Sequence, residues 1–484
     1  MDIVLLSDVY AEGYIRGAGA YKLATELRSA GYSVQVIDFA SRLTEQEVNK
    51  LFNKFLTQET KLLGVSNTFM SNNGNKIFEQ DWMLNLINEY KQRFNFKVAI
   101  GGNRGGPATY SKLARNVFDI LVSGFADKAI LAVAEGNAKG KLVNNQLIVD
   151  SNVDYEYTDF HNSKTIFTEQ DCIFPGEALP IEIARGCKFR CSYCFYPGNG
   201  KGDTYKHLKN KSVLRDELIY NYETFGTQVY DIMDDLLNDS PEKCEYIHEV
   251  FTNLPFKVSF GSYARSDLLI SNMHTLPLLE ESGAVGLQFG IETLFKKSGS
   301  AIGKGMAKEK TIEGLHYIKE NSNISLGSGF IFGLPYEPLE SIRSTIEWLD
   351  SKDCPLDNKE VYALSIPSLN SHFEHSKLMI DPYRWGYKDL EPTNKDRMIW
   401  DNGHINWYQA KELADECLNR FRNHNHFNAH QISRVYNMGY DVGTITNTPA
   451  AVFRNKFESI KPNSDSVLSK KKQYLEKQTH NHLL

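Results

Sequence analysis

The chain has 484 residues, of which 41% are hydrophobic and 24% charged, an ordinary globular composition that allows roughly two to four domains. Its formal net charge of −6 gives no general attraction to nucleic acid or to an anionic membrane, so we expect neither as a partner. The N-terminus lacks the basic start and cleavage site of a signal peptide, and no apolar stretch approaches the ~20 residues of a membrane span. We therefore expect a cytoplasmic protein.

Residues 1–150 alternate apolar strands with amphipathic helices, which predicts a doubly wound, Rossmann-like parallel α/β sheet. The glycines Gly13, Gly17 and Gly19 do not have the spacing of a dinucleotide-binding fingerprint, so they serve either tight turns or another ligand. The expected strands are Ile3–Ser7, Val34–Phe39, Lys61–Ser66, Lys97–Ile100 and Ile120–Ser123, and the expected helices are Tyr21–Ala30, Glu45–Leu56 and Trp82–Phe94.

A linker over residues 151–179 leads into a second α/β series over residues 180–367. Helical segments separate its strands, and one of them begins at Ser240 and buries Cys244 as a small core residue. The series predicts a partial (β/α)6 barrel of the TIM type. The expected strands are Ile181–Ala184, Val229–Met233, Lys257–Ser262, Ala284–Gly290, Ile324–Ile331 and Val361–Ile366.

Polar residues follow the strands of this second series. Each is a weak signal alone, because an acidic residue after a strand often caps the next helix. The carboxyl ends of barrel strands meet at one mouth, where active sites gather, so together they mark a candidate site. They are Asp234, Asp235 and Asp239, then Arg265 and Asp267, then Gln288 and Glu292, then Gly329 and Gly333.

Three of the seven cysteines lie within eight residues, in the stretch RGCKFRCSYC. Thiolates are ligands for zinc or for iron–sulfur clusters. Structural zinc takes four protein ligands, and no second cysteine pair follows Cys187, Cys191 and Cys194. A four-iron cluster held by three cysteines keeps one iron open for chemistry.

The spacing C-x-x-x-C-x-Φ-C, with Tyr193 as the aromatic residue, resembles the signature of the radical S-adenosylmethionine (SAM) enzymes. The resemblance implies a [4Fe-4S] cluster on Cys187, Cys191 and Cys194. It also implies that SAM binds the open iron and is cleaved to a 5′-deoxyadenosyl radical. An electron donor such as flavodoxin or ferredoxin and a small-molecule or peptide substrate are the implied partners.

The order of the segments RGCKFRCSYC, DIMDDLLND, SYARSD, GLQFGIETL and GFIFGLPYEPLESI resembles the radical SAM branch that carries an N-terminal cobalamin (B12)-binding domain. Residues 1–150 resemble that domain through LATELRSAGYSVQVIDF, VAIGGNRGGP and FDILVSGFADKAI. The resemblance places Gly101 and Gly102 at the cobalamin, Tyr193 and Ile331 at the adenine of SAM, and Asp234, Asp235, Arg265, Gln288 and Glu292 around SAM.

The chain departs from many cobalamin proteins, because it has no Asp-x-His-x-x-Gly motif to supply a histidine to cobalt. The nearest string, Asp159-Phe160-His161, lies beyond the α/β series and lacks the glycine. Three hypotheses therefore stay open. They are a cobalamin-dependent methyltransferase or related C–H-modifying enzyme, a radical SAM enzyme without bound cobalamin, and a zinc-stabilised or degenerate barrel that only binds. Residues 1–171 contain no cysteine, so we expect one cluster.

Residues 368–484 predict a mostly helical C-terminal extension with a charged tail. WYQAKELADECLNRF has an apolar stripe at helical spacing. The segment FRNHNHFNAH contains His424, His426 and His430 at a spacing that fits no standard metal site, and we expect it to be solvated.

Overall fold

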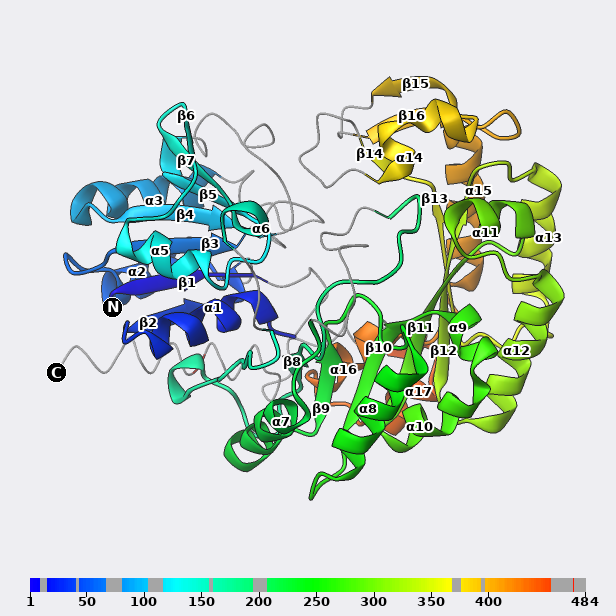
Figure 1. Ribbon diagram of the computed structural model, residues 1–484, viewed down its shortest axis with the longest axis horizontal. Helices are drawn as coiled ribbons and strands as arrows, with labels where there is room; N and C mark the ends of the chain where they lie inside the picture. Colours follow the sequence, from blue (N-terminus) through cyan, green and yellow to red (C-terminus); the bar gives the residue numbers. More distant parts are fainter. Residues whose placement is uncertain are drawn as a thin grey trace. The chain divides into compact units, whose positions relative to one another are not determined.

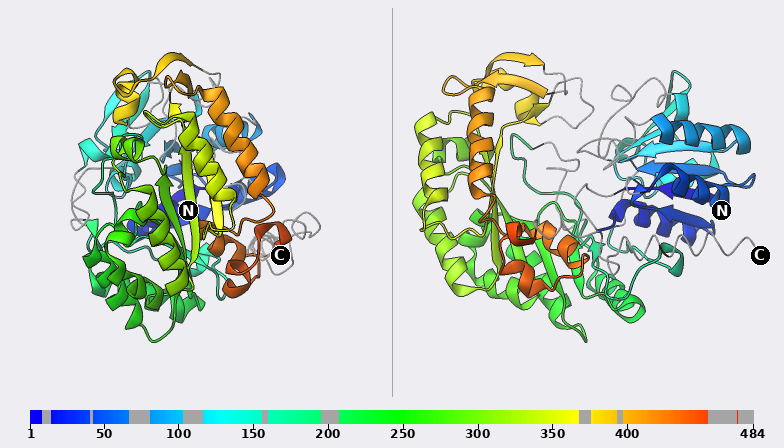
Figure 2. Two further views of the ribbon diagram at one scale, coloured as in Figure 1. Left: turned by 90° about the vertical axis from the view of Figure 1, so that its right-hand side faces the viewer. Right: turned by 180° about the vertical axis from the view of Figure 1, so that it is seen from behind.

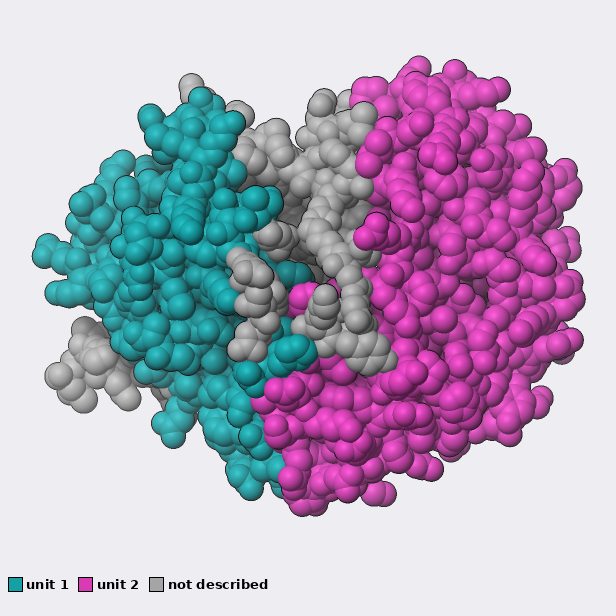
Figure 3. Space-filling model, in the orientation of Figure 1, with its two compact units in different colours: residues 1–181, 216–227, 462–484 teal, residues 182–215, 228–461 magenta. Residues whose placement is uncertain are grey.

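In the computed structural model, the chain divides into two compact units (Figure 3). The structure describes residues 1–8, 15–40, 43–66, 81–102, 116–155, 160–194, 207–367, 376–392, 397–453 and 473. Gly13, Asp159 and nearly all of the charged tail lie outside the described residues. Unit 1 consists of Met1–Ile181, Asp216–Thr227 and Pro462–Leu484, and unit 2 of Glu182–Arg215 and Gln228–Lys461.

Unit 1 contains a seven-stranded sheet of order β2-β1-β3-β4-β5-β7-β6, in which only β6 runs antiparallel to its neighbour (Figure 1). Buried aliphatic and aromatic side chains such as Val4, Phe52 and Ile87 form its core, which confirms the predicted doubly wound sheet. The strands are β1 (Ile3–Leu6), β2 (Val34–Ile37), β3 (Leu62–Ser66), β4 (Lys97–Gly101), β5 (Ile120–Ser123), β6 (Lys141–Val143) and β7 (Gln146–Asp150). The helices are α1 (Ala18–Ser29), α2 (Glu45–Phe55), α3 (Asp81–Phe94), α5 (Ala129–Glu135) and α6 (Ser151–Asp154), followed by the 3-10 turn η3 (Glu169–Asp171).

The sheet of unit 1 continues past Ser123, where the sequence predicted its last strand. β6 and β7 form a hairpin around Asn144 and Asn145, whose φ angles are 49° and 64°. Asparagine tolerates this left-handed conformation, and two such residues make the tight turn that joins antiparallel strands. β7 pairs in parallel with β5, so β7 and β6 extend the sheet by two strands.

A six-stranded sheet of order β13-β12-β11-β10-β9-β8 confirms the second predicted series. Its strands are β8 (Leu179–Ile181), β9 (Val229–Ile232), β10 (Ser259–Ala264), β11 (Ala284–Glu292), β12 (Ser325–Phe332) and β13 (Asn358–Ala363). The helices of this part are α7 (Lys211–Phe225), α8 (Pro241–Thr252), α9 (Ser266–Ser271), α10 (Leu276–Glu281), α11 (Lys296–Ile302), α12 (Lys308–Asn321) and α13 (Leu339–Asp350), with the 3-10 turn η5 (Met273–Thr275).

Helices cover the outer face of the six-stranded sheet, with α8, α10, α12 and α13 side by side along it (Figures 1 and 2). The hydroxyl of Ser240 accepts a hydrogen bond from the Lys243 backbone N–H at the start of α8, as its sequence predicts. Cys244 is buried on the same helix, which confirms its assignment to the core.

The C-terminal region is mostly helical, as expected, with α14 (Lys377–Ile380), α15 (Trp407–Phe421), α16 (Ala429–Tyr436) and α17 (Val442–Thr446), and the 3-10 turn η6 (Pro382–Trp385). It also contains an antiparallel sheet of β14 (Ile366–Pro367), β16 (Arg397–Asp401) and β15 (Lys388–Pro392), which the sequence did not predict. Among the described residues, no helix has the length and apolar character needed to cross a membrane.

Glycines allow α16 to pack closely on the inner face of the six-stranded sheet. A Cβ atom on Gly261 of β10 would lie 2.0 Å from the Ala429 carbonyl oxygen, and one on Gly286 of β11 would lie 2.5 Å from the Ile432 side chain. Any larger residue at these two positions would push the helix away. The C-terminal region therefore completes the inner side of the sheet.

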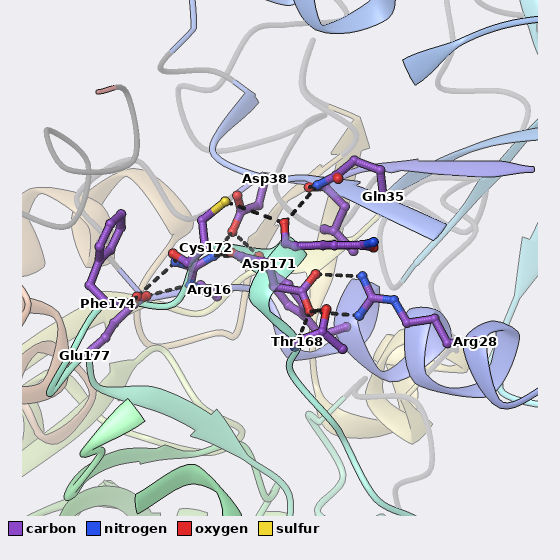
Figure 4. Close-up of polar contacts among 12 residues, drawn as sticks. Arg16, Arg28, Gln35, Asp38, Thr168, Asp171, Cys172, Phe174 and Glu177 are labelled. Carbon is purple, nitrogen blue, oxygen red and sulfur yellow. Dashed lines mark hydrogen bonds and ion pairs between the residues drawn. The ribbon is translucent and has the colours of Figure 1, made fainter. Parts of the chain in front are cut away.

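A fully buried arginine ties residues 160–181 to the sheet of unit 1 (Figure 4). The Arg16 guanidinium donates to both carboxylate oxygens of Glu177, at 2.5 and 2.9 Å, and to Asp38 at 3.1 Å. It also donates to the backbone carbonyls of Asp171 and Cys172, at 2.7 and 2.8 Å. Because the charge is buried, these partners must stay together for unit 1 to be stable.

Replacing Arg16 by Met should destabilise unit 1 by about 3–5 kcal/mol, because Glu177 and Asp38 would be left buried without their cation. Hydrogen exchange of β1 and β2 in the full chain measures this loss. The control is Lys164→Met, which removes a partly exposed ion pair with Asp216 and should cost about 1 kcal/mol or less. Equal protection of β1 in the two variants would contradict the stabilising role of Arg16.

Candidate active site

The three-cysteine loop follows β8, and neighbouring elements hold it through its backbone. The Cys194 N–H donates to the Cys191 carbonyl at 3.1 Å, which closes a turn. The Ser192 N–H donates to the Ile302 carbonyl at the end of α11 (3.3 Å), and the Ser192 carbonyl accepts from the Leu378 N–H of α14 (2.9 Å). The loop is therefore anchored on two helices of unit 2.

The chemistry of the loop is that of three soft thiol ligands in partly buried positions. Burial raises the pKa of the Cys187 thiol to about 11, and the charges of Asp235, Cys191 and Cys194 add to the effect. A metal would displace the thiol proton and stabilise the thiolate. Among the described residues, no group of three or more His, Cys, Asp or Glu side chains is arranged to hold a metal ion. The cluster assignment of the three cysteines thus stays a prediction.

Hydrogen bonds to Asp234 hold the start of this loop at the end of β9. Its carboxylate accepts hydrogen bonds from the backbone N–H groups of Ile183 and Ala184, at 2.8 and 3.0 Å. The buried Lys243 ammonium donates to its other side at 2.8 Å. Both oxygens of Asp234 are therefore engaged by unit 2 itself, which is a scaffolding contact.

The neighbouring Asp235 differs, because burial and the Asp234 charge raise its pKa to about 6. Its partly buried carboxyl group lies close enough to the loop to influence Cys187. The protonation of Asp235 can therefore change near neutral pH.

Tyr193, Glu292 and Lys304 form one polar cluster. The Tyr193 hydroxyl donates to Glu292 Oε1 at 2.6 Å, and the Lys304 ammonium donates to the same oxygen at 2.7 Å. Lys304 also binds the Gly290 carbonyl at 2.9 Å and lies over the Tyr193 ring. Glu292 ends β11 with a φ of 66°, a left-handed conformation that glutamate rarely adopts. Sequence reasoning paired Tyr193 with Glu292 at one site but missed Lys304.

The register of the strands places Gln288 and Ile331 on one face of the sheet. Gln288 of β11 pairs with Gly327 of β12 and with Tyr263 of β10, while Ile331 pairs with Tyr362 of β13. The absence of a side chain at Gly327 leaves the space that the Gln288 amide occupies. Gln288 and Ile331 therefore lie on the inner face of the sheet, and Glu292 lies at the carboxyl edge of that face.

Arg265 follows β10 and forms a bidentate ion pair with Asp267, at 3.0 and 2.6 Å. It also contacts the cysteine loop. In unit 1, Gly101 ends β4, and Gly102 after it has a φ of 127°. Residues 103–107, the rest of the predicted segment VAIGGNRGGP, lie outside the described residues.

The histidines near the C-terminus have separate partners. His430 is buried, not solvated as the sequence predicted, and its Nδ1 lies 2.7 Å from Asp231 Oδ1. The Nδ1 of His426 lies 2.8 Å from the Thr446 carbonyl oxygen. The error arose because α16 packs on the sheet, a long-range contact that local polarity does not reveal.

Glu337, in the segment GFIFGLPYE, is a buried acid that sequence reasoning did not single out. It accepts a hydrogen bond from the Thr293 hydroxyl, which ties the loop after β12 to the end of β11. Burial raises its pKa to about 7, although hydrogen bonds from Thr293 and from the Gly333 and Leu334 backbone partly oppose the shift.

The raised pKa of Glu337 predicts that stability falls as pH rises. The folded state favours the protonated acid, so ionisation between about pH 4.5 and pH 7 costs up to roughly 3 kcal/mol. Urea unfolding followed by tryptophan fluorescence at pH 5 and pH 8 should show this loss for the wild type and a smaller one for Glu337→Gln. The exposed Glu340→Gln is the control, and identical pH dependence in all three proteins would contradict the prediction.

Comparison with known proteins finds a family match in the middle of the chain. Residues 181–349 match the model of the radical SAM superfamily. A relative named as an uncharacterized methyltransferase, PH0819 of Pyrococcus horikoshii, is 25% identical over 183 residues. These cover 37% of this chain and 39% of the relative, so the similarity spans well under two thirds of that protein.

Two solved structures share the fold of nearly the whole chain. The radical SAM methyltransferase TsrM of Kitasatospora setae, with cobalamin and a [4Fe-4S] cluster bound, is 14% identical and has a TM-score of 0.68. The similarity covers 95% of this chain and 100% of TsrM. The cobalamin-dependent enzyme OxsB, with aqua-cobalamin and SAM bound, is 14% identical over 100% of this chain and 81% of its own, with a TM-score of 0.63. Residues 181–349 therefore carry a match to the radical SAM superfamily, and the chain shares its fold with two solved structures that contain cobalamin.

Proposed function

We propose that the protein is a cobalamin-dependent radical SAM methyltransferase that acts on a small-molecule or peptide substrate. The observation that carries this proposal is the three-cysteine loop at the carboxyl edge of a parallel sheet, within residues that match the radical SAM model. Active sites of α/β barrels gather at that edge. The names of TsrM and of the Pyrococcus relative, both methyltransferases, support the reaction type.

Cys187, Cys191 and Cys194 are the residues that would hold the cluster, and the doubly wound sheet of unit 1 would hold cobalamin. When bound, the cluster supplies one electron for SAM cleavage, and cobalamin supplies a carrier for the methyl group. Asp234 and Lys243 fix the loop that carries the thiols. Tyr193, Glu292 and Lys304 offer hydroxyl, carboxylate and ammonium groups for orienting SAM.

The proposal also assigns a reductant and a compartment. A flavodoxin or ferredoxin would deliver the electron, because radical SAM chemistry needs a one-electron donor. Cysteine ligands must stay reduced, which suits the cytoplasm.

Changing Cys187, Cys191 and Cys194 together to Ala should remove the cluster, because no thiolate would remain on the loop. Anaerobically purified wild type should contain about four irons per chain, and the triple variant close to none. SAM cleavage should disappear with the iron. The control is Cys354→Ala, which changes a cysteine outside the loop and should keep both iron and cleavage. Cleavage that survives in the triple variant would refute the cluster assignment.

Protein expressed in cobalamin-fed cells should carry about one cobalt per chain. The triple cysteine variant should retain that cobalt, because its changes lie in unit 2 while the predicted cobalamin segment lies in unit 1. Cobalt and iron are measured by elemental analysis, and the cobalamin absorbance bands identify the bound form. About four irons without cobalt would refute the cobalamin assignment and favour the radical SAM enzyme without bound cobalamin.

A further inference from the structure

Arg265 lies between β10 and α9, and it contacts both α9 and the cysteine loop. Its backbone is fixed first, because the Asn238 side chain accepts from the Arg265 N–H (2.8 Å) and donates to its carbonyl (2.9 Å). The residue is only 6% exposed, so the position of its charge is determined by protein groups and not by solvent.

Each of the three guanidinium nitrogens donates a hydrogen bond to a protein group. Nε and Nη2 bind the two oxygens of Asp267, and Nη2 also donates to the Gly303 carbonyl at 3.0 Å. The remaining nitrogen, Nη1, donates to Cys191 Sγ at 3.9 Å. The Phe189 ring lies against the guanidinium plane, with 4.3 Å between the Arg265 Cζ and the ring centroid.

This arrangement depends on arginine. A planar guanidinium can bind a carboxylate with two nitrogens, stack on an aromatic ring and still direct a third nitrogen at another acceptor. A lysine ammonium would keep the charge but could not satisfy these directions together. Asp267 and Phe189 therefore orient a cationic N–H donor toward the sulfur of Cys191.

We propose that Arg265 is a positioning residue that sets the reduction potential of the cluster through the sulfur of Cys191. The inference rests on the proposed function, because it needs a cluster on Cys191. A hydrogen bond from a cation to a ligand sulfur withdraws electron density and stabilises the reduced cluster, which carries more negative charge. The potential is therefore higher with Arg265 in place. The bond to the Gly303 carbonyl holds the same guanidinium against the end of α11, where Ser192 is also anchored.

The test is a redox titration of the reconstituted full chain without SAM, followed by electron paramagnetic resonance. At a fixed potential, Arg265→Gln should hold about tenfold less reduced cluster than the wild type, which is ~59 mV for a one-electron couple. Arg265→Lys keeps the charge without the directed donor and should shift less. Arg420→Gln removes an exposed ion pair with Asp350 and should leave the potential unchanged.

The outcomes separate the inference from the proposed function. Iron-replete Arg265 variants with the wild-type potential would overturn the inference alone. A wild type that binds no iron would overturn the proposed function and the inference with it. If Arg265→Gln loses iron, Arg265→Lys decides the matter, since a lowered potential supports the role of the donor and an unchanged one overturns it.

Discussion

The parallel pairing of β9 to β13 is the constraint on which the candidate site depends. Because neighbouring strands run in the same direction, each one ends at the same edge of the sheet and must leave it through a loop there. Asp234, Arg265 and Glu292 follow or end three successive strands, although about sixty residues separate the first from the last. The sheet thus concentrates polar groups that the sequence spreads out.

Burial at this edge makes compensation of charge the second requirement. A carboxylate removed from water needs hydrogen-bond donors or a cation, and its own neighbours in sequence rarely supply them. Glu292 forms an ion pair with Lys304, which follows α11, and Asp234 forms one with Lys243 of α8. In unit 1, Arg16 forms a similar ion pair with Glu177, which lies far from it in the sequence. Each pair links separate elements, so the charges also fix the positions of loops.

The sequence was sufficient for features with a local physical signal. Apolar runs located the strands, and Ser240 located the start of α8. The hairpin at Asn144 and Asn145 also had such a signal, in the two asparagines between apolar runs. β13 begins earlier than expected because Asn358 and Glu360 lie on the inner face, where polar residues interrupt the apolar pattern.

The features that the sequence could not predict are pairings over long separations. Nothing near Lys304 marks it as a partner of Glu292, and nothing near His430 points to Asp231, because both contacts exist only once the sheet has formed. The same limit applies to the acidic pair after β9. Asp234 and Asp235 look equivalent in the string DIMDD, yet backbone N–H groups and Lys243 engage the first, while burial beside it raises the pKa of the second. The motif identifies both residues as candidates. Only their surroundings in the folded chain show that Asp234 supports the loop and that the pKa of Asp235 is raised.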